Sequence, residues 1–202
     1  MKYYRIEPRL DNIKQLKQTI ELCYSKYINS IVVTPDLIAA TFEALCQKGY
    51  KMKVGACVGH TSFDEGINKF SHIVGDVFDA DYFEVHTSLS NGMRMIKDLS
   101  DSCSIIKNAV DEAKEVCWVL NNINSSTIDD LVSNVSKYTK PDVMCVNTTN
   151  IEKNYAAVNE IKDRLHIKSK LVIQNLEDVD KYDVDCYSLE TKSFLQIAKI
   201  KE

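Results

Sequence analysis

The sequence predicts a compact α/β fold, a (β/α)8 TIM barrel with short loops, and three observations support this class. Short apolar runs alternate with longer segments of helical periodicity, which is typical of βα units and a parallel sheet. Eight such units follow one another without a linker, and strands this apolar are buried on both faces. Each unit spans roughly 25 residues, near the low end for barrels, so we expect no long functional insertion.

The eight runs that we expect to form strands are rich in valine, isoleucine and cysteine. They span residues 3–6, 30–33, 52–58, 82–86, 116–120, 142–146, 170–173 and 184–188. An open doubly wound sheet would show the same alternation, but no G-x-G-x-x-G motif follows the first run, which argues against a dinucleotide-binding sheet. In a closed barrel we expect the following strand residues to be largely buried: Val32, Val54, Ala56, Cys57, Val119, Cys145, Val172 and Cys186.

The segments between these runs carry helix signals. Apolar residues spaced three or four apart define the buried face of the first helix: Leu10, Ile13, Leu16, Ile20 and Tyr24. Capping or turn signals at residues 34–35, 62–65, 88–92, 126–129 and 149–152 begin the next five helices. Short helical stretches follow the last two strands.

Composition and charge exclude several classes of function. The chain has 202 residues, is 45% hydrophobic and 27% charged, and has a formal net charge of -4, so no global field attracts nucleic acid. Charges stand where a signal peptide would have its apolar run, and no apolar stretch approaches the roughly 18 residues of a membrane span. We expect one domain over residues 1–202, located in the cytoplasm, with neither nucleic acid nor membrane as a partner.

Seven cysteines are spread along the chain without a C-x-x-C pair. This odd number and this spacing favour neither a disulfide framework nor a zinc site, so most of the thiols should be reduced and buried. We expect no metal and no cofactor.

Three segments, residues 31–35, 53–59 and 82–85, resemble the second, third and fourth strands of deoxyribose-phosphate aldolases in order and spacing. The family has there a valine-rich strand ending in x-Pro, then V-K-V-x-x-V-x-G, then E-I-D-x-V, whose aspartate assists proton transfer. The resemblance places Glu84 at the position of that aspartate. It covers most of the chain in layout, is specific over residues 30–85, and implies an aldolase-type barrel.

The motifs that carry the family's chemistry are degenerate in this chain. Residues 143–149 resemble the family's F-V-K-T-S-T strand, but Val146 stands where the Schiff-base lysine belongs. Residues 171–175 resemble its V-K-A-S-G-G strand, but the second lysine and both phosphate-binding glycines have no counterpart. Class I aldolases need an amine that forms an imine, so the resemblance implies a divergent member without that lysine. We expect the remaining lysines to be solvated, on helix surfaces or at strand starts.

Active sites of such barrels lie at the carboxyl-terminal ends of the strands, where this sequence places polar side chains. We expect Glu84, His60 and His86 to form a proton-transfer group; a metal held by the two histidines and the carboxylate is less favoured, since the spacing is no known ligand motif. The residues that we expect to bind a ligand through hydrogen bonds are Asn121, Asn147, Thr148, Gln174, Asn175 and Ser188. Asn121 and Asn147 could instead serve turn backbones, and Asn175 a helix N-cap.

Three hypotheses of function follow. The first is a carbon–carbon lyase (aldolase) acting on a sugar phosphate through a displaced lysine. The second is a barrel that has lost catalysis and persists as a binding or assembly subunit, a pseudoenzyme. The third is an acid-base enzyme that uses Glu84 with His60 or His86 and forms no imine. We favour a divergent barrel that binds a small phosphorylated or hydroxylated metabolite without ordinary aldolase activity, and the sequence is compatible with a homo-oligomer.

Overall fold

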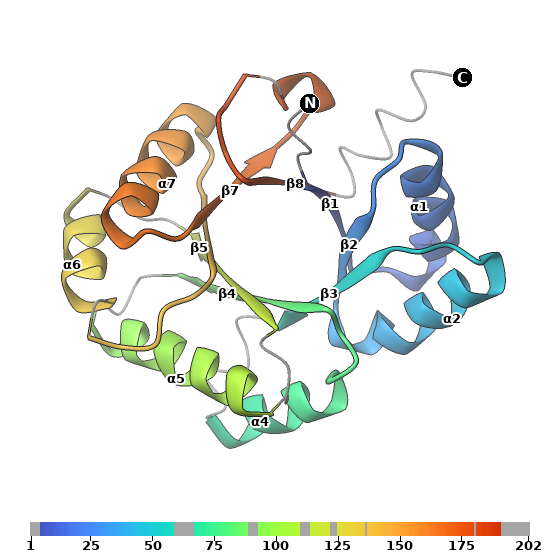
Figure 1. Ribbon diagram of the computed structural model, residues 1–202, viewed down its shortest axis with the longest axis horizontal. Helices are drawn as coiled ribbons and strands as arrows, with labels where there is room; N and C mark the ends of the chain where they lie inside the picture. The colour runs from blue at the N-terminus through green and yellow to red at the C-terminus, as the bar shows by residue number, and fades with distance from the viewer. Residues whose placement is uncertain are drawn as a thin grey trace.

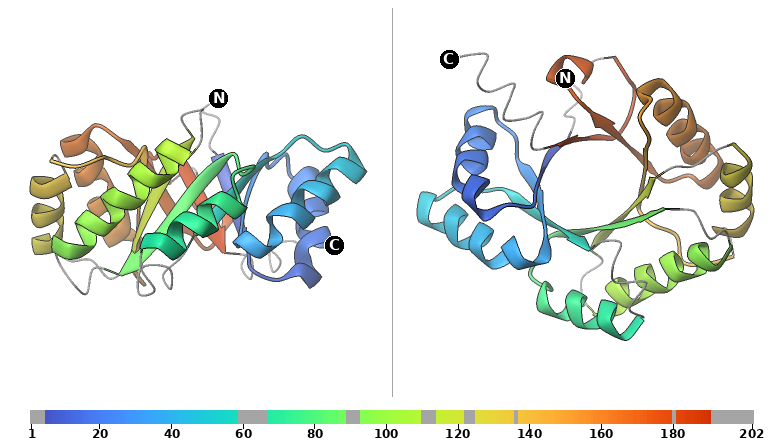
Figure 2. Two further views of the ribbon diagram at one scale, coloured as in Figure 1. Left: turned by 90° about the horizontal axis from the view of Figure 1, so that it is seen from below. Right: turned by 180° about the vertical axis from the view of Figure 1, so that it is seen from behind.

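Eight parallel strands close into a barrel in the order β1 to β8, with β8 paired to β1. The computed structural model describes residues 5–58, 67–88, 93–109, 114–121, 125–135, 137–179 and 181–190. Helices surround the barrel on its outside, as seen along the axis (Figure 1) and from the side and the rear (Figure 2). The predicted (β/α)8 fold is confirmed, and the open sheet is excluded.

The elements alternate along the chain as the sequence predicts. The strands are β1 (Arg5–Leu10), β2 (Ser30–Val33), β3 (Lys53–Val58), β4 (Tyr82–Ser88), β5 (Glu115–Asn121), β6 (Val143–Asn147), β7 (Lys168–Ile173) and β8 (Cys186–Glu190). The helices are α1 (Ile13–Ser25), α2 (Ile38–Lys48), α4 (Ile67–Asp76), α5 (Met93–Ala109), α6 (Ser125–Val135) and α7 (Ile151–Leu165), with 3-10 turns η1 (Pro35–Leu37) and η3 (Leu176–Asp178). No helix in the described ranges is both long enough and apolar enough to cross a bilayer.

Three local predictions are wrong. On the expected buried face of the first helix, Ile13 and Tyr24 are exposed and Leu10 belongs to β1, because α1 buries Leu16, Thr19, Ile20 and Cys23 instead. The first strand was expected over residues 3–6, but β1 extends to Leu10, because charged residues at alternate positions and Pro8 hide the strand pattern. Thr149 was expected to cap its helix, but the N-cap of α7 is Asn150, whose Oδ1 accepts a hydrogen bond from the Lys153 amide at 3.0 Å. Thr34 and Asn175 do occupy N-cap positions, before η1 and η3, without a side-chain cap bond.

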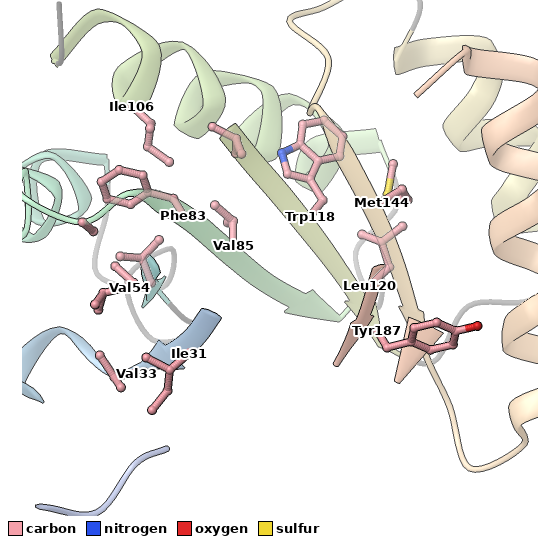
Figure 3. Close-up of a cluster of buried hydrophobic side chains, with 14 of the residues drawn as sticks. Ile31, Val33, Val54, Phe83, Val85, Ile106, Trp118, Leu120, Met144 and Tyr187 are labelled. Atoms are coloured by element: carbon pink, nitrogen blue, oxygen red, sulfur yellow. The ribbon is translucent and has the colours of Figure 1, made fainter. Parts of the chain in front are cut away.

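The strands separate two buried layers, because successive side chains point to opposite faces. The outward layer is apolar and packs between the strands and the helices; Phe83, Trp118 and Met144 belong to it (Figure 3). The inward layer contains a second, smaller cluster, with Cys117, Val119, Val143, Cys145, Val172 and Cys186. The predicted burial is confirmed for all the strand residues named above except Cys57, which is only partly buried.

The amino-terminal end of the barrel is closed by a repeated contact. Asp81, Asp142 and Asp185 each precede an even-numbered strand, and each carboxylate accepts a hydrogen bond from a backbone amide of the preceding strand. The amide donors are those of Val54, Val116 and Ser169, at 2.7, 2.9 and 2.8 Å. The ring of Tyr82 lies against Gly55, and its hydroxyl is 2.8 Å from Ser30 Oγ. These contacts pair polar groups at the amino-terminal end, and the active sites of such barrels lie at the opposite end.

Candidate functional site

The inward face of the barrel holds a buried ionic group centred on Glu84. This residue lies on β4 and is fully buried. Its Oε2 is 2.9 Å from His86 Nε2 and 3.1 Å from Arg9 Nη2, and its Oε1 accepts a hydrogen bond from Lys170 Nζ. Arg9 comes from β1 and Lys170 from β7, so three strands distant in sequence supply one cluster. A carboxylate in a barrel interior is tolerated only when it is paired in this way.

The pKa directions follow from burial and charge. Burial alone would raise the pKa of Glu84, but the charges of Arg9 and Lys170 and the hydrogen bond with His86 hold that pKa well below its usual range. Burial lowers the pKa of His86 more than Glu84 raises it, so the imidazole is neutral at pH 7. Burial is the largest single influence on Arg9 and lowers its pKa, but the Glu84 carboxylate and the neighbouring thiols of Cys145, Cys57 and Cys117 together outweigh it, so the net shift is upward. The group therefore contains an ionised acid hydrogen-bonded to a neutral base.

Cys57 stands beside this group on β3. Burial, with a smaller contribution from Glu84, raises the pKa of its thiol to about 12, so the sulfur is protonated at neutral pH. Within the described residues, Cys57, Glu84 and His86 place one ligand atom each within 4.8 Å of one another. Arg9 and Lys170 already neutralise the carboxylate, however, and their charges oppose a divalent cation at the same place. The geometry thus favours proton transfer over metal binding.

A cavity of about 540 Å³ lies at the carboxyl-terminal ends of β5, β6 and β7. Its lining is made of amides, hydroxyls, one carboxylate and two apolar side chains: Asn121, Asn147, Thr148, Thr149, Ile151, Asn154, Val172, Gln174 and Asp178. Lys170 precedes Val172 by two positions on β7, so its side chain leaves the strand on the same inward face. A cavity with these donors and acceptors can bind a polar metabolite of small size.

The loop between β6 and α7 is held by a side chain from the helix. Asn154 is buried on α7, and its Oδ1 accepts hydrogen bonds from the Thr148 amide at 2.9 Å and from Thr148 Oγ1 at 2.6 Å. Its Nδ2 donates to the Thr148 carbonyl at 3.2 Å. Thr148 therefore has its hydroxyl proton committed to the protein, which leaves Asn147 as the neighbouring side chain with donors to offer a ligand.

The structure brings together most, but not all, of the residues expected at the site. Glu84 and His86 are in contact, whereas His60 lies outside the described residues. Of the expected ligand-binding residues, four line the cavity: Asn121, Asn147, Thr148 and Gln174. Asn175 does not line it and is exposed at the start of η3, and Ser188 is buried on β8 beside Val172.

Two residues of the ionic group around Glu84 were not predicted from the sequence. Arg9 was expected in a loop or helix, since the first strand was predicted to end at residue 6. Lys170 was expected to be solvated at the start of a strand, but its side chain is fully buried. The expectation that the seventh strand offers no lysine to the site is therefore wrong. The alternation of Lys168 and Lys170 with Ser169 and Leu171 is the signal that could have placed one lysine on the inward face.

The position on β6 that corresponds to the family's Schiff-base lysine is also not Val146 but one of its inward-facing neighbours. Val146 faces outward and packs in the layer beneath the helices. The inward residues of β6 are Val143, Cys145 and Asn147. No lysine occurs from Pro141 to Glu152, so the absence of an amine on this strand does not depend on the register.

Comparison with known proteins finds solved structures with a similar fold, but no match by sequence. No protein-family model and no curated protein matches the chain. Among solved structures, the chain is similar to the tetrameric deoxyribose-phosphate aldolase from Aeropyrum pernix, with a TM-score of 0.73 and 14% identity over 96% of this chain and 88% of that one. It is also similar to an aldolase named QR15, with a TM-score of 0.67 and 16% identity over 98% and 97% of the two chains.

The likeness extends to other lyases with the same barrel. The N-acetylneuraminate lyase (sialic acid aldolase) from Aliivibrio salmonicida matches with a TM-score of 0.63 and 9% identity, over 100% of this chain and 73% of that one. At such identities the likeness concerns the fold alone. The resemblance to deoxyribose-phosphate aldolases, expected from residues 30–85, is confirmed at that level.

Proposed function

We propose that the protein binds a small hydroxylated or phosphorylated metabolite at the carboxyl-terminal ends of β5, β6 and β7, without the ordinary Schiff-base reaction of deoxyribose-phosphate aldolases. The observation that carries this proposal is the cavity of about 540 Å³ in which Asn121, Asn147 and Gln174 present amide groups. Side-chain amides offer both donors and acceptors, which suits hydroxyl and phosphoryl oxygens.

The lack of an amine on β6 supports the second half of the proposal. Imine formation requires a lysine that can lose its proton and attack a carbonyl carbon. The inward positions of β6 hold Val143, Cys145 and Asn147, none of which supplies an amine. Within the part of the barrel that the structure describes, the group around Glu84 is then the candidate for chemistry.

Glu84 and His86 are suited to proton transfer. The neutral imidazole donates to the ionised carboxylate through Nε2, which leaves Nδ1 without its proton in this tautomer. A base with a lowered pKa and a fixed orientation can take a proton from a hydroxyl or from a carbon next to a carbonyl. We therefore assign the proton-transfer role to His86, with Glu84 as the residue that orients it.

The binding half is tested by calorimetric titration with deoxyribose 5-phosphate. We expect saturable binding that weakens about threefold to tenfold in Asn147→Ala, the range expected for one lost neutral hydrogen bond. Asn108→Ala, on the exposed end of α5, is the matched control and should bind as the parent does. Equal affinities in the parent and Asn147→Ala would contradict the proposed location.

A second candidate, an imine-forming lyase, is favoured by one observation: Lys170 is fully buried in the barrel with its ammonium against Glu84. Transfer of a proton from Lys170 to Glu84 would free the amine to attack a carbonyl, with loss of water to give the imine. Burial favours the neutral form of an amine, whereas the carboxylate favours the charged form. Because burial and the carboxylate act in opposite directions on the charge of the amine, chemical trapping is the direct test of this candidate.

Borohydride reduction in the presence of deoxyribose 5-phosphate separates the two candidates. The binding proposal predicts no substrate-sized mass increase and no cleavage to acetaldehyde. An adduct that peptide mapping assigns to Lys170, and that disappears in Lys170→Arg, would establish the lyase and refute the proposal. Lys162→Arg, a surface change on α7, controls for nonspecific modification.

A further inference from the structure

Three polar groups that face the cavity at the ends of β5, β6 and β7 make no hydrogen bond within the described part of the chain. They are the side-chain amides of Asn147 and Gln174 and one carboxylate oxygen of Asp178, the last residue of η3. The other oxygen of Asp178 accepts a hydrogen bond from Lys181 Nζ at 2.8 Å. Polar groups that line a cavity and lack a partner in the protein are available to a ligand.

The segment that carries Asp178 is fixed against the rest of the barrel. The hydroxyl of Tyr187, a fully buried residue of β8, contacts two backbone carbonyl oxygens of this segment. The hydroxyl of Tyr182 donates a hydrogen bond to Glu152 of α7 at 2.7 Å. The Asp178 side chain is 16% accessible and that of Lys181 is 60% accessible, so the lysine lies toward solvent and the carboxylate toward the cavity. The carboxylate therefore has a fixed place in the cavity wall.

A carboxylate oxygen at this place favours a hydroxyl group over a phosphoryl group. An ionised carboxylate only accepts hydrogen bonds, whereas a hydroxyl both donates and accepts. A ligand hydroxyl can therefore donate to Asp178 while it accepts from the amide of Asn147 or Gln174. A phosphate monoester carries a charge of about -1.5 to -2 at pH 7 and presents acceptor oxygens, so it is repelled by the carboxylate and has no proton to donate to it.

The amino-terminal end of α7, next to the cavity, already has acceptors from the protein. Helix ends of this kind attract anions through free backbone amides and the helix dipole. Here Asn150 Oδ1 accepts a hydrogen bond from the Lys153 amide at 3.0 Å, and Glu152 places a carboxylate in the first turn. Thr149 and Ile151 bring this helix end to the cavity wall, but the two acceptors reduce its attraction for a phosphate group.

We propose that Asp178 is a specificity-determining residue that selects an uncharged, polyhydroxylated ligand, such as a free sugar or a polyol, over a phosphate monoester. The inference rests on the proposed function and narrows its ligand class to hydroxylated compounds without a phosphate group. The carboxylate accepts from one ligand hydroxyl, and the neighbouring amides donate to the same or to an adjacent hydroxyl. Deoxyribose 5-phosphate then binds through its hydroxyl groups, less tightly than an uncharged compound of the same chain length.

Two acyclic probes, ribitol and ribitol 5-phosphate, test the inference, because they differ by one phosphate group. The readout is an NMR titration of the side-chain amide signals of Asn147 and Gln174, which report binding in the cavity and give both dissociation constants. We expect the parent protein to bind ribitol more tightly than ribitol 5-phosphate. In Asp178→Asn, which keeps the size of the side chain and removes its charge, ribitol should bind about threefold to tenfold more weakly, and the preference for it should fall by about tenfold or more.

Two further variants separate a role in specificity from a role in structure. Glu177→Gln removes an exposed charge one residue away on η3 and should leave both dissociation constants nearly unchanged. Lys181→Gln breaks the ion pair with Asp178 but leaves the carboxylate, so the preference for ribitol should persist or increase. If the ion pair had only a structural role, Asp178→Asn and Lys181→Gln would change binding alike, and that result would overturn the inference. Tighter binding of ribitol 5-phosphate than of ribitol by the parent would overturn it as well.

Failure of the inference can be told apart from failure of the proposed function. If the two probes bind equally in the parent and in Asp178→Asn, and both are weakened by Asn147→Ala, the cavity binds hydroxyl groups and Asp178 does not select among ligands. If the parent protein binds neither probe and also fails to bind deoxyribose 5-phosphate, the proposed function fails as well.

Discussion

The inward and outward faces of the barrel strands carry different kinds of side chain. Phe83 and Leu171 face outward into an apolar layer, whereas their neighbours Glu84 and Lys170 face inward and form an ion pair. The outward layer could be exchanged for other apolar residues of the same volume with little effect on chemistry. The inward face holds charges whose burial is justified only by specific partners. In this barrel the outward face therefore determines the fold, and the inward face carries the candidate site.

The largest effect should come from breaking the inward ion pair. Glu84→Gln removes the buried carboxylate that pairs with Arg9 and Lys170, and we expect a loss of about 3–5 kcal/mol in the free energy of unfolding. Urea denaturation followed by circular dichroism measures it. Glu160→Gln, on the exposed side of α7, is the control and should change little. A Glu84→Gln variant as stable as the parent would mean that the pair is not buried as described.

The next effect concerns the closed end of the barrel. A Cβ at residue 55 would lie 2.3 Å from a ring carbon of Tyr82, so Gly55→Ala should destabilise the fold by roughly 1–3 kcal/mol through overpacking. At Gly75, in α4, an added Cβ meets nothing within 4 Å, and Gly75→Ala should leave stability unchanged or raise it. Equal behaviour of the two variants in thermal unfolding would show that Tyr82 does not close this end.

A smaller effect is expected at the aspartates of that end. Asp142→Ala removes the acceptor of the Val116 amide, and the half-exposed position allows water to replace part of the bond, so we expect a loss of about 1 kcal/mol. Hydrogen exchange should report faster exchange of the Val116 amide in this variant. Asp163→Ala, an exposed change on α7, is the matched control.

The smallest effect is a dependence of stability on pH. The pKa of His86 is lower in the folded protein than in the unfolded chain, so the unfolded chain binds more protons and the folded state loses stability as pH falls below about 6.5. Glu84, whose folded pKa is depressed, contributes stability that is lost at still lower pH. His86→Gln should flatten the stability curve between pH 7 and 5, whereas the exposed His72→Gln should not.

The sequence was sufficient to predict the apolar residues of the outward face, but not all of the charged residues of the inward face. Apolar runs such as residues 116–120 identify strands because both faces are buried, and their count predicts the barrel. Glu84 was recognised because a carboxylate inside an apolar run needs a partner. Its partners were not, because Arg9 lies in a charged segment that resembles a loop and Lys170 at the start of a run that resembles a solvated end. Their burial depends on pairing across the barrel, which sequence-local patterns do not contain.

The central claim, that the inward face at the carboxyl-terminal end of the barrel binds the metabolite, is tested most directly by NMR. The side-chain amide signals of Asn121, Asn147 and Gln174 are followed during titration with deoxyribose 5-phosphate, together with those of the surface residues Asn108 and Asn134. We predict saturable shifts of the first three signals and none of the last two. Shifts confined to groups near Asp81 and Asp142, at the closed end, or no saturable shift at all, would contradict the account.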